Sequence, residues 1–234
     1  MSTILPETRL SPAPPRGVAI SGIIFAALYF ASLVLIRLAV PADPTERGAW
    51  LADPVLRGWL RFALNLVPFT GIAFLWFMGV LRNRIGRLED QFFATVFLGS
   101  GLLFVAITFV VAALTQGLLD TFATDGRTPA QSESYALGRE MAYALMNTFA
   151  VKMAAVFIMV TSTIGKRTGV LPRWMVVVGF AVALVMLLSI SDFAWIFLVF
   201  PLWVLLLSAY ILVTDFSAPK AIIQLHQETQ GNRD

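Results

Sequence analysis

The 234-residue chain contains no cysteine and a single histidine, and only 13% of its residues are charged. The absence of cysteine excludes disulfides, thiolate nucleophiles and cysteine-bound metals. The lone histidine, His226, excludes bis-histidine haem and the zinc-metalloprotease motif. No cofactor and no metal is therefore expected. A soluble domain carries about 25% charged residues, so this chain also lacks the charge that a water-exposed surface needs.

The residues that replace those charges are apolar, and 58% of the chain is hydrophobic. A helix of roughly 20 apolar residues crosses a bilayer, whereas a barrel strand needs only about ten residues of alternating polarity. The apolar runs here are long and continuous, so we predict an all-α, polytopic transmembrane bundle of six helices. The predicted spans are residues 18–40, 59–81, 91–119, 141–164, 174–191 and 193–214.

The segments outside these spans are polar. Residues 1–16 are rich in proline and are predicted to be disordered, residues 17–214 to form the membrane domain, and residues 215–234 to form a cytoplasmic tail. A signal peptide is the alternative for the first run, but its apolar core is usually about 7–15 residues long. Between spans, we expect a short interfacial helix within Pro41–Gly58 and an exposed loop over Asp120–Glu140.

The basic residues predict an orientation. Ten of them fall on the side of the N-terminus and six on the opposite side, which favours both termini in the cytoplasm. The predicted location is thus the bacterial cytoplasmic (inner) membrane, crossed several times. The net charge of +3 comes from residues at the ends of apolar runs, which argues against nucleic acid as a partner. The expected partners are the bilayer and its anionic lipids; a protein partner or a homo-oligomer stays open.

Lys152 is the one charged residue deep inside a predicted span. It follows Met141 by 11 residues, or roughly 16 Å of helix, which places it near the middle of a core about 30 Å thick. A central lysine costs on the order of 3 kcal/mol on insertion scales. It could bind an anionic group or relay protons inside the bundle, or it could snorkel or cap a helix carbonyl. The sequence leaves both interpretations open.

Other polar residues gather toward the predicted outer half of the spans. They suggest a polar recess open to the outside, with Lys152 at its floor and Asp192 as a candidate counter-charge. The alternative is ordinary hydrogen bonding between helices and at the interface. The candidate recess or binding residues are Lys152, Thr148, Asn147, Asn65, Gln116, Arg61, Arg37 and Asp192. No catalytic residue is predicted, because no aspartate or glutamate lies inside a span and His226 lies in the tail.

The turn Gly165–Trp174, which ends in Leu-Pro-Arg-Trp before an apolar run containing Gly179, resembles a known pattern. It is similar to the inner turn of small multi-pass bacterial membrane proteins classed as domains of unknown function. The resemblance covers about 30 residues, extends loosely to the six-span layout and implies no activity or site residue. We predict a non-enzymatic membrane component or a small-ligand-binding or accessory subunit. The alternative is a small transporter or channel that uses a recess around Lys152.

Overall fold

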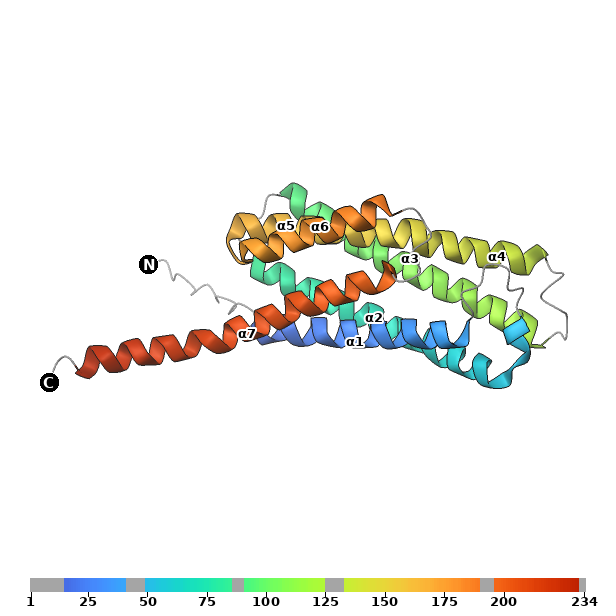
Figure 1. The fold of residues 1–234 in the computed structure, drawn as a ribbon, viewed down its shortest axis with the longest axis horizontal. Helices are drawn as coiled ribbons and strands as arrows, with labels where there is room; N and C mark the ends of the chain where they lie inside the picture. The colour runs from blue at the N-terminus through green and yellow to red at the C-terminus, as the bar shows by residue number, and fades with distance from the viewer. Residues whose placement is uncertain (1–14, 41–48, 86–90, 125–132, 190–195, 232–234) are drawn as a thin grey trace, which may run out of the picture.

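The computed structural model describes residues 15–40, 49–85, 91–124, 133–189 and 196–231, and every regular element in these ranges is a helix. The elements are α1 (Pro15–Ala39), the 3₁₀ helix η1 (Ala49–Ala52), α2 (Pro54–Ile85), α3 (Gln91–Thr124), α4 (Glu133–Ala144), the π-helix η3 (Leu145–Ala150), α5 (Val151–Thr168), α6 (Arg173–Leu188) and α7 (Ile196–Gly231). They run up and down in one elongated bundle (Figure 1).

The prediction of an all-α, six-helix bundle is confirmed. The elements α4, η3 and α5 form one continuous rod, so the bundle has six rods in the described part of the chain. Five of them are long and apolar enough to cross a membrane. The sixth, α6, has 16 residues and is about 24 Å long, somewhat less than a hydrocarbon core of about 30 Å.

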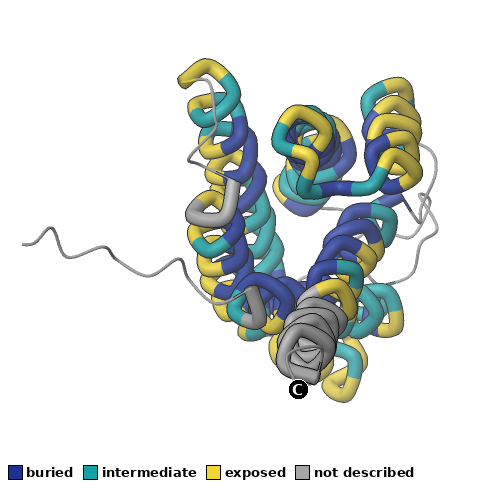
Figure 2. The backbone as a smooth tube through the Cα atoms, turned by 90° about the vertical axis from the view of Figure 1, so that its left-hand side faces the viewer, coloured by how far each residue is buried: buried dark blue, intermediate teal, exposed yellow. Residues whose placement is uncertain are grey.

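The outside of the bundle is apolar, as lipid requires. Trp76 and Phe69 on α2 are 70% and 59% exposed, and similar side chains line the outer faces of α1, α3 and α6. Viewed from the end, buried positions face the inside of the bundle and exposed positions face outward (Figure 2). A surface this apolar marks a membrane-embedded protein, because soluble monomers rarely expose such contiguous patches.

The two ends of the bundle differ in what they contain. At the turn end, α2 ends, α3 begins and a short turn joins α5 to α6. At the opposite end, which we call the cavity end, lie η1 and the first residues of α2 and α4 (Figure 1). The start of α1 and the later part of α7 both lie toward the turn end, so an even number of crossings separates them.

The turn between α5 and α6 has a simple physical cause. Gly169 ends α5 with φ of +69°, a left-handed conformation that glycine adopts without steric cost. The Leu171 N–H then donates to the Gly165 carbonyl at 3.2 Å, and the Leu171 side chain packs on Gly165. Pro172 follows in an extended conformation and precedes the first residue of α6. The sequence that carries the family resemblance is thus a helix-capping turn.

The half of the bundle nearer the turn end, which we call the turn half, has an aromatic core. Phe25, Phe74, Phe104, Phe157 and Phe200 come from five different helices, and their rings contact one another at centroid distances of 4.7–6.0 Å. All five side chains are buried. Ring contacts of this geometry contribute beyond their buried area, so this cluster fixes how the helices pack.

Small residues let the outer helices approach the rest of the bundle. A Cβ placed on Gly179 of α6 would collide with the Ser162 Oγ of α5, and one placed on Gly22 of α1 would collide with the Ser208 Oγ of α7. Both hydroxyls are buried and have no hydrogen-bond partner. Close approach through small residues is how helices gain van der Waals contact in lipid, where water supplies no driving force.

One predicted boundary is wrong. The stretch Asp120–Glu140 was expected to be an exposed loop, but α3 continues to Thr124 and α4 begins at Glu133. Hydropathy detects a helix where apolar residues follow one another, whereas α4 has the mixed sequence ESYALGREMAYA. It is helical because Tyr135 is buried and Gly138 lies against Leu118 of α3.

The beginning of α2 also differs from the prediction. It starts at Pro54, before the predicted span, because Asp53 caps it through a hydrogen bond from the Val55 N–H to the carboxylate at 2.8 Å. Of the predicted tail, residues up to Gly231 continue α7. The predictions for residues 1–14, 41–48 and Asp192 lie outside the described ranges.

Candidate functional site

Lys152 caps the end of a neighbouring helix. Its Nζ donates hydrogen bonds to the backbone carbonyls of Leu187 and Ser189, at 2.5 and 3.0 Å, where α6 ends. The last carbonyls of a helix have no partner within the helix and carry a partial negative charge. The ammonium group supplies both a donor and the complementary charge. Of the two interpretations that the sequence left open, the contacts fit the capping of a helix carbonyl.

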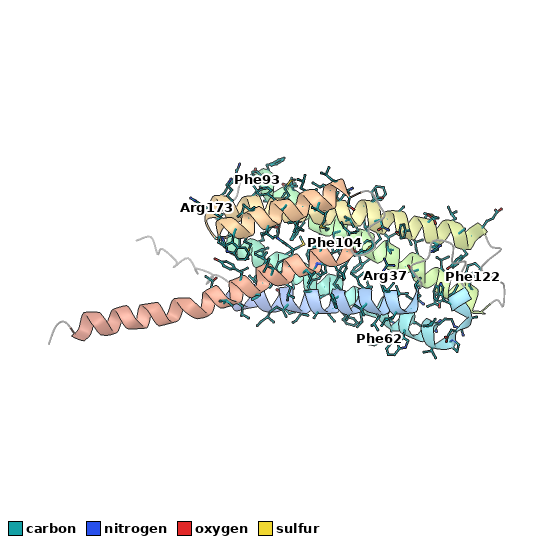
Figure 3. All side chains as sticks on the ribbon, in the orientation of Figure 1. Arg37, Phe62, Phe93, Phe104, Phe122 and Arg173 are labelled. Carbon is teal, nitrogen blue, oxygen red and sulfur yellow. The ribbon has the colours of Figure 1, made fainter. Side chains whose placement is uncertain are left out.

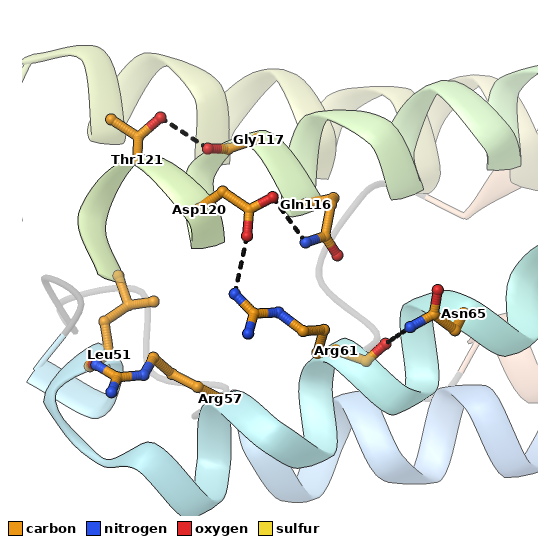
Figure 4. A network of polar contacts seen from close by, with 8 residues as sticks. All are labelled: Leu51, Arg57, Arg61, Asn65, Gln116, Gly117, Asp120 and Thr121. Carbon is orange, nitrogen blue, oxygen red and sulfur yellow. Dashed lines mark hydrogen bonds and ion pairs between the residues drawn. The ribbon is translucent and has the colours of Figure 1, made fainter. Parts of the chain in front are cut away.

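Three other candidates form a network on the outer surface of the cavity end. Arg61 of α2 pairs with Asp120 of α3 at 2.9 Å, and Gln116 donates to the same carboxylate at 2.9 Å (Figure 4). Asn65 donates to the Arg61 carbonyl at 2.9 Å. The Arg61 and Asp120 side chains are 53% and 55% exposed, so solvent screens their attraction. This network joins α2 to α3 and is not part of an internal recess.

The candidates on η3 point in different directions. Asn147 is buried and donates from Nδ2 to the Tyr143 carbonyl at 3.0 Å, whereas Thr148 is exposed. The π-helix itself is visible in the backbone, because the Val151 N–H bonds to the Met146 carbonyl, five residues earlier. Single π-turns inside α-helices are rare and occur frequently at functional sites. This one places Asn147 on the wall of a cavity.

That cavity has a volume of about 240 Å³. It lies in the half of the bundle nearer η1 and the beginning of α2, which we call the cavity half. Its walls come from α1, α2, α3, α4 and η3, with residues of η1 at one end and Phe197 of α7 at the other. The lining residues are Tyr29, Ser32, Leu33, Ile36, Arg37, Val40, Trp50, Leu51, Leu64, Val67, Thr70, Thr108, Val111, Ala112, Thr115, Leu118, Leu119, Tyr135, Arg139, Ala142, Tyr143, Met146, Asn147 and Phe197. Most of them are apolar or aromatic, as in known ligand pockets.

The serine and threonine hydroxyls on the wall donate to the helix backbone. Ser32, Thr70, Thr108 and Thr115 each donate to the carbonyl four residues earlier, at 2.8–3.0 Å. Such bonds are typical of serine and threonine inside helices. The wall therefore offers hydroxyl oxygens as acceptors while keeping their donors satisfied.

Among the lining residues that the structure describes, the charged ones are two arginines. Arg37 comes from the cavity end of α1 (Figure 3), and Arg139 comes from α4. Both are partly buried and both also interact with other groups of the protein. No carboxylate is present among the described lining residues. The described wall is therefore apolar over most of its surface and carries two arginine side chains.

The structure thus separates the eight sequence candidates. It brings Arg37 and Asn147 together on one cavity wall and places Lys152, Arg61, Asn65, Gln116 and Thr148 elsewhere, while Asp192 lies outside the described residues. Arg139, Tyr135 and the four serine and threonine hydroxyls were not among the residues predicted from the sequence. Arg139 and Tyr135 fell in the expected loop, and a helical pattern through that loop would have revealed them.

No protein-family model, no curated protein and no solved structure matches the chain. The cavity is therefore interpreted from its own chemistry. In the described part of the chain, its lining contains no histidine, cysteine or acidic residue, and no group of such residues elsewhere could hold a metal ion.

Proposed function

We propose that the protein is a non-enzymatic integral membrane protein that binds a small, largely apolar ligand in the cavity of α1–α4 and η3. The observation that carries this proposal is the cavity itself. It leaves a space of about 240 Å³ between the helices, whereas protein interiors keep few voids larger than a water molecule. A void that holds a ligand is compatible with folding, because binding energy offsets the lost packing.

The chemistry of the wall supports binding rather than catalysis. A hydroxyl becomes a nucleophile when a base lies beside it, and the described lining residues supply no such base. The serine and threonine hydroxyls donate instead to helix carbonyls. Lys152 was the centre of the alternative, a transporter or channel, and its bonds to the end of α6 support a structural role instead.

The setting of this function follows from the basic residues. We place the protein in the bacterial cytoplasmic membrane with both termini in the cytoplasm, so the cavity end faces the outside. The resemblance of the Gly165–Trp174 turn to small multi-pass bacterial membrane proteins supports that setting. A role as the ligand-binding subunit of a larger assembly is consistent with the size of the chain.

Photolabelling tests the proposal. The protein in lipid nanodiscs is irradiated with decanol that carries a diazirine in its chain, and labelled peptides are mapped by mass spectrometry. We expect label on the α1 and α3 segments that line the cavity. The variant Ala112→Phe fills the cavity and should remove most of that label.

The matched control is Ala113→Phe, which places the same bulk one residue away on an exposed face of α3. It should leave the cavity label unchanged. Label that is confined to lipid-facing residues, or that is equally strong in Ala112→Phe, would overturn the proposed function. Both variants should unfold within about 1 kcal/mol of the wild type, since one fills a void and the other faces lipid.

A further inference from the structure

We infer that the ligand of the cavity is an apolar alcohol, whose neutral hydroxyl group donates a hydrogen bond to the amide oxygen of Asn147. This inference rests on the proposed function and names the chemical class of the ligand and the residue that recognises it. The burial of Asn147, the hydrogen bond that orients its amide and the π-turn that carries it support this assignment.

Asn147 is a buried amide on the wall of the cavity. The residue is 6% exposed and lines the space. A buried polar group needs hydrogen-bond partners, because one left unpaired away from water costs free energy. The Nδ2 of Asn147 donates to the Tyr143 carbonyl at 3.0 Å. A side-chain amide has two N–H donors and an oxygen with two acceptor lone pairs, so this bond leaves most of its hydrogen-bonding capacity for a ligand.

The bond to Tyr143 also fixes the direction of the other polar atoms of Asn147. The amide group is planar, so holding Nδ2 against the carbonyl of its own helix holds the amide oxygen in place. A side chain that is already oriented loses less conformational entropy on binding. A ligand hydroxyl can donate to this oxygen, whereas an ether or a ketone has no hydrogen to donate and would leave the oxygen unpaired beside an apolar ligand.

A second asparagine shows what is particular to Asn147. Asn65 of α2 makes the same kind of bond, from Nδ2 to the carbonyl four residues earlier, at 2.9 Å (Figure 4). Asn65 is exposed, and α2 stays α-helical there, so the bond itself requires no π-turn. Asn147 is instead buried, lines the cavity and lies in η3. Because π-turns occur frequently at functional sites, these differences point to ligand recognition by Asn147.

The rest of the wall favours an apolar body and an uncharged polar group. Most lining residues are aliphatic or aromatic, and moving a charged head group from water to such a surface is far more costly than moving a hydroxyl. Arg37 and Arg139 also lie on the wall, and both already interact with other groups of the protein. The serine and threonine oxygens of the wall are acceptors whose own hydrogens donate to helix carbonyls, so they too suit a ligand that brings a donor.

Competition against the photoreactive decanol tests the inference. Decanol, decanethiol, decyl methyl ether and decanoate are titrated against it in nanodiscs of neutral lipid, each at a measured concentration in the lipid. We expect decanol to compete at a concentration about tenfold lower than the thiol or the ether, because S–H is a weak donor and the ether has none. The thiol is close in size to the alcohol and controls for the added methyl group of the ether. Equal competition by decanol and the thiol, or stronger competition by decanoate, would overturn the inference.

The variant Asn147→Leu replaces the amide by an apolar group of similar size. The photoreactive decanol should then label the cavity at a higher probe concentration, and decanol should compete no better than the thiol. Asn65→Leu, which removes the exposed asparagine with the same backbone bond, is the matched control and should keep the tenfold preference. If Asn147→Leu fails to fold, Asn147→Ala removes the same amide and should also abolish the preference. A preference for decanol that survives the loss of the amide contradicts the role of Asn147.

Failure of this inference differs from failure of the proposed function. If the probe labels the cavity but the alcohol is not preferred, or the preference does not depend on Asn147, the assignment of the ligand class falls and the proposed function stands. If the probe does not label the cavity of the wild-type protein at all, the proposed function itself fails.

Discussion

The same helices are filled differently in the two halves of the bundle. In the turn half, α1, α2 and α3 contribute Phe25, Phe74 and Phe104 to a cluster of contacting rings. One helical turn toward the cavity end, α2 and α3 carry Thr70 and Thr108 instead, and these side chains line the cavity. The cavity therefore arises where smaller side chains replace phenylalanines on continuous helices. On α2 and α3, its position follows from side-chain size and not from a change in the helix backbones.

The largest effect should come from breaking the dense half. Phe74 is fully buried and contacts five other phenylalanine rings, so Phe74→Ala should lower the free energy of unfolding by about 2–3 kcal/mol. This is at or below the range for soluble cores, because the unfolded segments remain in an apolar medium. Denaturation in mixed micelles measures it. Phe69→Ala, on the lipid-facing side of α2, should stay within about 0.5 kcal/mol of the wild type.

A smaller loss is expected where α5 and α6 approach. Gly179→Ala places a methyl group against the Ser162 Oγ and should cost about 1–3 kcal/mol of unfolding free energy. The double variant Ser162→Ala/Gly179→Ala removes that hydroxyl and should recover most of the loss, because the remaining Ser162 Cβ contact is 3.2 Å. If Gly179→Ala left the free energy of unfolding unchanged, the turn half would accommodate added volume as readily as the cavity half.

The smallest effect concerns the boundary between the halves, where α6 ends. Lys152→Met leaves the Leu187 and Ser189 carbonyls without their donor but also removes a costly charge, so the net loss should be about 1 kcal/mol. Lys166→Met, an exposed lysine on the same helix, should have no effect. Stability unchanged together with lost decanol labelling would contradict the capping role and return Lys152 to the candidate site.

Hydropathy alone predicted the fold class because lipid forces each apolar run to satisfy its backbone internally. It could not predict the ends of α3 and α4, since those turns are stabilised by contacts such as that of Gly138 with Leu118 and not by lipid. It also could not show that α6 ends beside Lys152. That depends on the length of α6 relative to the rod of α4 and α5.

The candidate site was predicted in part for a similar reason. Arg37 and Asn147 stood out as polar residues within apolar runs, and both line the cavity. Arg61 and Gln116 stood out equally, yet they face outward and pair with Asp120. Which side of a helix faces inward is decided by packing between distant segments. The sequence therefore predicts how far along a helix a polar residue lies. Whether that residue faces the inside or the outside of the bundle is seen only in the structure.

The π-helix η3 changes the helical register within the continuous rod of α4, η3 and α5, which extends through both halves of the bundle. One residue more than an α-helix would use is accommodated between α4 and α5, where the Val151 N–H reaches back five residues. Deleting a single residue in η3 would restore α-helical register and rotate α4 by about 100° relative to α5. Arg139 and Tyr135 would then turn away from the cavity while α5 kept its place in the aromatic core. The insertion of one residue thus sets the orientation of α4 independently of α5.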